Sequence, residues 1–228
     1  MNIRRYLFVL VFSLLLFEGY SQSNYQTGFL PSINFNKKLE KDWSINFKIE
    51  SRQLIEEGEI GKNNPTNYEY LLTDFSWIAS KKIKINQSIA GGYLLRIRNQ
   101  KPTHRFIQQY TITKNYSGFR LSHRFVADET FDEEESIQLR LRYRISTLFP
   151  FSGLSVDPKE YYLKINHEYL NSFQNSKYDL EIRLIPFLGY AFSNTSKIEV
   201  GLDYRTNSFL ENNTSNRFWF SMNWYISF

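Results

Sequence analysis

The sequence has no cysteine among its 228 residues, so it carries no disulfide framework and no thiolate metal site. It also has no apolar run of the roughly 20 residues that a membrane-spanning helix needs. Neither a G-x-S-x-G stretch nor a phosphate-binding glycine loop is present. These absences leave two settings for the chain: a soluble protein, or a protein that crosses a membrane without helices.

Basic residues are not concentrated in any part of the sequence. The chain has 28 Lys and Arg against 23 Asp and Glu, which gives a formal net charge of +5. Removal of residues 1–21 takes away two Arg and one Glu and leaves +4. Basic residues alternate with acidic ones and form no patch, so the sequence predicts no nucleic-acid partner.

The N-terminus has the organisation of a secretory signal peptide. A basic region, Arg4 and Arg5, precedes an apolar stretch of about a dozen residues at 6–17. Small residues, Gly19 and Ser21, occupy the −3 and −1 positions before a cleavage site at Gln22. The apolar stretch is too short for a membrane anchor. We predict that residues 1–21 are cleaved and that residues 22–228 form a single domain.

Aromatic residues, by contrast, are abundant. Sixteen Tyr, twenty Phe and four Trp make up 18% of the chain, although the mean hydropathy is −0.46. They fall in runs of strict alternation, most clearly at residues 136–145, where Ile, Leu and Tyr alternate with Gln and Arg. Period two is the signature of a strand with one apolar and one polar face.

This alternation predicts eleven strands, at residues 25–36, 43–55, 68–80, 83–98, 104–114, 119–129, 136–149, 161–173, 178–192, 198–210 and 217–228. The first is the weakest because Pro31 interrupts it. Single-chain bacterial barrels have even strand numbers. We therefore expect 10–12 strands and leave the parity open.

Two architectures fit such strands. A soluble sandwich or lipocalin-like barrel turns its apolar face inward and has short strands, whereas a transmembrane barrel turns that face to lipid and has strands of nine residues or more. The runs are long, and aromatics gather near their ends, as in interfacial girdles; these are Trp43, Tyr68, Tyr70, Trp77, Tyr110, Tyr116, Phe149, Phe151, Tyr161, Tyr162, Tyr190, Phe192 and Trp219. The sequence favours an all-β, antiparallel, up-and-down transmembrane barrel in the bacterial outer membrane.

The connections between strands predict an orientation. Acidic or Asn-rich segments follow the second, sixth and tenth strands, and tight turns such as KK, NYSG and SNTSK follow the third, fifth and ninth. Bacterial barrels place short turns in the periplasm and longer loops outside. The last strand then ends at the inner interface with Phe228. Residues 150–160, PFSGLSVDPKE, are long for a periplasmic turn.

Several motifs resemble a known family. FRLSHRF (119–125), RLRYR (140–144), NHEYL (166–170) and the closing strand with its terminal Phe are similar to bacterial outer-membrane barrels of the domain of unknown function 2490 family. The resemblance covers about residues 25–228 and implies an outer-membrane β-barrel with no established activity. The terminal Phe also resembles the signal by which the barrel-assembly machinery recognises its clients, so this machinery, outer-membrane lipid and lipopolysaccharide are the expected partners.

The inward phase of the strands carries a ladder of charges. The candidate luminal network comprises Lys48, Glu50, Arg120, Arg124, Arg140, Arg142, Arg144, Glu168, Glu181, Arg183, Asp203 and Arg205. A solute pore uses such cations to attract anions. In small barrels, however, side chains fill the interior, and the favoured interpretation is that these charges neutralise one another in a packed network.

Two other groups of residues suggest chemistry. The segment ADETFDEEES at 127–136 has carboxylates that a divalent cation would accept, but it lacks the spacing of an EF-hand, and a solvated loop is favoured. His123 and His167 fall in the outward phase, yet the adjacent Ser122 points to the opposite face and forms no dyad with His123.

The sequence therefore predicts a non-enzymatic envelope protein, either structural or a narrow passage for an unspecified small solute, without a cofactor or metal. Two alternatives remain: a membrane-embedded lipid hydrolase, and a binding protein that uses residues 56–67 and 128–135.

Overall fold

The computed structural model describes residues 24–62, 64, 66–132, 135–211 and 214–228. The predicted signal peptide lies outside these residues. The described residues form eleven strands: β1 (Asn24–Lys38), β2 (Trp43–Glu59), β3 (Thr66–Lys84), β4 (Gln87–Arg98), β5 (Lys101–Tyr116), β6 (Phe119–Phe131), β7 (Gln138–Pro150), β8 (Glu160–Gln174), β9 (Lys177–Ala191), β10 (Ser196–Asn207) and β11 (Ser215–Ser227). No helix in the described part of the chain is long and apolar enough to span a membrane.

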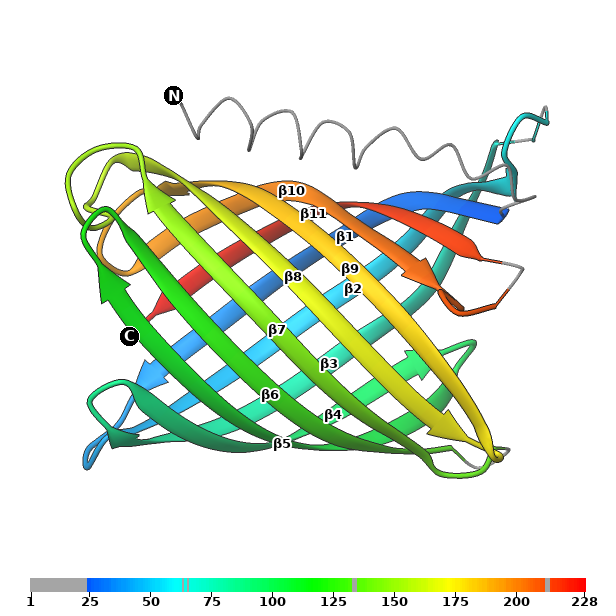
Figure 1. Cartoon of the computed structure of the whole chain (residues 1–228), viewed down its shortest axis with the longest axis horizontal. Coiled ribbons are helices and arrows are strands. Elements are labelled where there is room, and N and C mark those ends of the chain that lie inside the picture. Colours follow the sequence, from blue (N-terminus) through cyan, green and yellow to red (C-terminus); the bar gives the residue numbers. More distant parts are fainter. Residues whose placement is uncertain (1–23, 63, 65, 133–134, 212–213) are drawn as a thin grey trace, which may run out of the picture.

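The strands follow one another in chain order around a closed barrel (Figure 1). Each pairs antiparallel with the next, and the barrel closes where β1 pairs with β11 in parallel, from Asn24 opposite Ser215 to Asn36 opposite Ser227. An odd number of strands closes in this way because its first and last strands point in the same direction. The barrel prediction is confirmed, and the stretch interrupted by Pro31 is a full strand that pairs on both sides.

The connections divide between the two ends of the barrel. We call the end with residues 39–42, 85–86, 117–118, 151–159 and 192–195 the turn end, at the left of Figure 1, and the opposite end the loop end. The predicted turn at Lys81-Lys82 is wrong, because Lys81 still pairs with Ile89 and the chain reverses at residues 85–86. Two loop-end hairpins turn over two residues with positive φ, Asn99-Gln100 and Asn175-Ser176, as type I′ turns require.

The barrel is apolar outside and polar inside. Phe220 is 62% exposed and Leu141 54%, whereas Glu168 is 2% exposed and Asp128 1%. This distribution is the inverse of that in a soluble barrel, whose apolar residues face inward. The described strands therefore have their apolar face outside and their polar face inside, the arrangement expected of the transmembrane alternative.

A small apolar cluster lies inside the barrel toward the loop end. It consists of Leu30, Leu54 and Trp219, with Leu71 packed against it. Gly28 makes room for the indole, because a Cβ there would lie 2.6 Å from the Trp219 ring and 2.1 Å from the Gln53 carbonyl oxygen. Trp219 and Tyr162 are buried, so their predicted place in the aromatic girdles is wrong.

Candidate functional site

A cavity of about 630 Å³ occupies the barrel interior. Its lining extends from Ser44 and Ser80, near the turn end, to Arg98, beside a loop-end hairpin. Among the described residues, thirteen Lys and Arg line this luminal cavity but only five Asp and Glu do so. Two buried carboxylates behind this lining, Asp128 and Glu199, bind four of these cations, and the walls still carry a net positive charge.

Strand register creates many of the ion pairs in this cavity. Asp74 on β3 lies directly opposite Arg96 on β4, and the guanidinium binds the carboxylate through two bonds of 2.8 and 2.7 Å. Glu168 on β8 lies opposite both Arg144 and Arg183, with oxygen–nitrogen distances of 2.7 and 2.9 Å. Opposite charges at facing positions stabilise the sheet, since their side chains meet across the ladder.

Other pairs form along a single strand. Asp203 and Arg205 on β10 are two residues apart and share a luminal face, and they form two hydrogen bonds of 2.8 and 2.7 Å. Lys48 pairs in the same way with Glu50, and Arg183 with Glu181. Where acidic and basic residues alternate along the luminal face of one strand, ion pairs therefore form within that strand.

Asp128 is the most heavily shared carboxylate. It receives hydrogen bonds from Arg140 at 2.6 Å and Arg142 at 2.7 Å, and Arg105 lies 3.4 Å away on the other side. Its side chain is fully buried. The prediction that Asp128 belongs to an acidic surface loop is wrong, because β6 continues to Phe131 and even-numbered residues of β6 face the lumen.

Some luminal cations form no ion pair with any carboxylate in the described part of the chain. Arg52 is buried, its Nε donates to no partner, and its guanidinium lies 5.3 Å above the Trp219 ring. Arg124 lines the cavity and forms no ion pair with a described carboxylate. Of these two side chains only Arg124 belongs to the predicted network, and the strands supply fewer acids than bases in the inward phase.

The twelve residues of the candidate network divide between two spaces. Eleven line the luminal cavity, and Arg120 does not. It lies at the start of β6 and lines a separate pocket at the turn end. The network also contains residues that the sequence analysis did not assign to it, namely Arg52, Asp74, Arg96, Arg98, Arg105, Lys164 and Arg217. The sequence could have predicted that Arg52 faces the lumen, since it follows Lys48 and Glu50 at intervals of two residues on the same strand.

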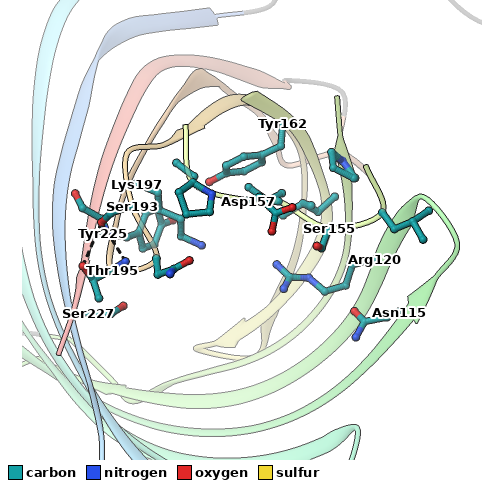
Figure 2. Close-up of a pocket in the computed structure, with 18 of the residues that line it drawn as sticks. Asn115, Arg120, Ser155, Asp157, Tyr162, Ser193, Thr195, Lys197, Tyr225 and Ser227 are labelled. Carbon is teal, nitrogen blue, oxygen red and sulfur yellow. Dashed lines mark hydrogen bonds between the residues drawn. The ribbon is translucent and has the colours of Figure 1, made fainter. Parts of the chain in front are cut away.

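The turn-end pocket has a volume of about 470 Å³ (Figure 2). Residues 151–159 fold over it and supply part of its wall, which accounts for the length of this connection. Between the pocket and the luminal cavity lies Glu199, which accepts hydrogen bonds from Tyr162 at 2.9 Å, Lys164 at 2.8 Å and Tyr225 at 3.1 Å. A Cβ at Gly189 would lie 2.2 Å from the Tyr162 ring, so the glycine lets this ring lie across β9.

Comparison with known proteins identifies a family. The model of the family described as protein of unknown function (DUF2490) matches residues 27–224. The chain belongs to this family. No curated protein matches, and no solved structure matches either.

The histidines of this DUF2490 barrel face outward, away from the charged lumen. His123 Nδ1 lies 2.8 Å from the Tyr143 hydroxyl, and the His167 ring meets the Tyr169 ring edge to face. Ser122 points into the barrel, where its hydroxyl lies 2.8 Å from that of Thr113. Ser122 and His123 therefore form no nucleophile–base pair.

The acidic segment after β6 is shorter than the sequence predicts. Residues 133 and 134 lie outside the described part, and Asp132 accepts a hydrogen bond from Thr103 at 2.8 Å. In residues 56–67, Glu56 binds the Tyr25 hydroxyl and Glu57 accepts from Gln26 at 3.0 Å. Several of these carboxylates therefore join neighbouring segments of the loop end to one another.

Proposed function

We propose that this DUF2490 barrel is an integral protein of the bacterial outer membrane and a narrow passage for small anions. The apolar outer surface supports the membrane location, because hydrocarbon is the solvent in which exposed Phe, Leu and Met side chains are stable. The predicted signal peptide and terminal Phe228 agree with export and with recognition by the barrel-assembly machinery. Outer-membrane lipid and lipopolysaccharide then surround the barrel.

The excess of cations around the luminal cavity carries the functional part of the proposal. Thirteen bases line a space that reaches toward both ends of the barrel, against five lining acids and the buried Asp128 and Glu199, and this net positive charge attracts anions and repels cations. Arg124 matters most, since it lines the cavity, is exposed there and forms no ion pair with a described carboxylate. A structural envelope protein with a closed lumen is the second candidate, and the same experiment decides between them.

Ion conduction tests this function. The refolded protein in a planar bilayer is expected to give stable current, with a reversal potential in a KCl gradient that shows preference for chloride. Arg124→Glu is expected to reduce that preference, because it replaces an unpaired luminal cation with an anion. Lys37→Glu makes the same charge change at an exposed position beside the turn end and is expected to leave the preference unchanged. Absence of current would favour the structural protein, and cation preference would contradict the proposal.

A further inference from the structure

The turn-end pocket differs in chemistry from the luminal cavity. Its only charged lining residues in the described part of the chain are Arg120, Asp157 and Lys197. The other walls carry hydroxyl and amide groups on one side and apolar or aromatic groups on the other. A pocket of this composition and size matches a small organic ligand better than a free inorganic ion.

Two cations turn toward the interior of this pocket. Figure 2 shows Arg120 entering from one side and Lys197 from the other. Neither forms an ion pair with a described carboxylate. Lys197 instead lies over the Tyr225 ring, with its Nζ 5.1 Å from the centroid. Both cations are therefore available to a ligand.

The nearest buried carboxylate is already compensated. Glu199 is 1% exposed, and Lys164 reaches both of its oxygens, at 3.1 and 2.8 Å. Tyr162 and Tyr225 donate to the same two oxygens. Because Lys164 neutralises Glu199 from the luminal side, the charges that remain in the described lining are Arg120, Lys197 and Asp157, which leave the pocket with a net positive charge.

Neutral donors surround these two cations. The polar lining residues of the pocket are Asn115, Ser155, Ser193, Asn194, Thr195, Ser196 and Ser227. In the 192–195 turn, the Ser193 hydroxyl accepts from the backbone N–H of Thr195 at 3.2 Å and of Ser196 at 3.1 Å. It also lies 3.2 Å from the Thr195 hydroxyl, so these two hydroxyls share one hydrogen bond and one of their two protons remains for a ligand. Phosphate, with several strong acceptor oxygens, suits a set of two cations and several hydroxyls.

The opposite walls are apolar. Leu148 and Pro150 come from the end of β7, and Leu154, Val156 and Pro158 come from the connection that covers the pocket. Tyr162 completes this side with its ring. These groups exclude water from the body of a ligand whose charged end meets Arg120 and Lys197.

We propose that the turn-end pocket binds a small organic phosphate, with the phosphate held by Arg120 and Lys197 and a ring or other apolar body held against the 151–159 connection. This site is separate from the luminal passage. Its ligand comes from solution, because the pocket lies inside the ring of strands, between the Glu199 hydrogen bonds and the connection that covers it.

Calorimetric titration of the mature protein in zwitterionic micelles tests the proposal with phenyl phosphate as the probe. We expect saturable binding at least about tenfold tighter than that of inorganic phosphate or phenol, because each of these supplies only half of the contacts. Arg120→Gln and Lys197→Gln are each expected to weaken binding about tenfold, the effect of losing one charge-assisted hydrogen bond.

Arg124→Gln is the matched control, since Arg124 lies four residues further along β6 in the same phase but lines the luminal cavity. It is expected to leave phenyl phosphate affinity unchanged. Heat-modifiable gel migration verifies that each variant is folded, and Lys197→Gln serves alone if Arg120→Gln does not fold. Absence of binding, or equal losses in Arg120→Gln and Arg124→Gln, would overturn the site. Displacement of the probe by phosphatidic acid would overturn its assignment to a dissolved ligand. Loss of conduction does not affect this result.

Discussion

Replacement of Asp128 with Asn is expected to lower the free energy of unfolding by about 3–5 kcal/mol, the cost of removing one partner from a buried ion pair. The amide keeps the shape of the side chain but leaves Arg105, Arg140 and Arg142 close together with no negative charge between them. Denaturant titration of the protein refolded into lipid vesicles measures the loss.

Asp42→Asn is the control for this substitution. Asp42 lies in the exposed turn between β1 and β2 with φ of 64°, a conformation that Asn adopts readily, so little change is expected. A second substitution gives the mechanism: Arg140→Gln in the Asp128→Asn background is expected to restore part of the stability, because it removes one of the unbalanced cations. If Asp128→Asn unfolds at the same denaturant concentration as the unaltered protein, the luminal cluster does not stabilise the barrel.

Val200→Arg is expected to destabilise the inserted barrel by about 2–4 kcal/mol, the cost of a lipid-facing Arg near the middle of a bilayer. Val200 lies near the middle of β10 and is 44% exposed, and its neighbours across the strands are Leu188 and Met222, both outward and apolar. The folded fraction on unheated gels and denaturant titration in vesicles both report the change.

Gln109→Arg provides a depth-matched comparison. Gln109 lies near the middle of β5 but lines the luminal cavity, so its replacement adds a cation to a water-accessible space and is expected to cost much less. A barrel surrounded by water would give the opposite order, since Val200→Arg would then be neutral on an exposed surface. Equal tolerance of both substitutions would therefore contradict the membrane location.

Period-two alternation is sufficient to predict the strands, because one face of each strand meets an apolar environment and the other a polar one. Residues 136–149 were expected to form a strand, and β7 spans Gln138–Pro150. The parallel closure was not predictable, since alternation within a strand carries no information on which strands meet at the ends of the sheet. Pro31 was also misleading, because the strand pairs with β11 at the proline and with β2 before and after it; the ladder to β2 lapses only at Leu30 and Pro31.

The site was predictable only in part, for two physical reasons. The alternation of inward and outward residues shows which side chains face the lumen but not how far along the barrel axis they lie. Arg120 and Arg124 both face inward by this pattern, yet they line different cavities. The second reason is that an acidic run is typical of a surface loop, and Asp128 begins such a run. Its side chain nevertheless faces the lumen, because it lies two residues after Val126 on the same strand. Which charges pair depends on strand register, as for Asp74 and Arg96.

The seam between β1 and β11 has a practical consequence for engineering the barrel. Both strands enter at the loop end, and the seam extends to the C-terminus, where the Phe228 N–H bonds to the Asn36 carbonyl at 2.9 Å. In the proposed membrane location, peptide tags placed before β1 and after β11 would therefore be accessible to antibody from opposite sides of the membrane. A circular permutant that joins these two strands cannot use a hairpin turn, because its linker must span the full height of β11, a strand of 13 residues.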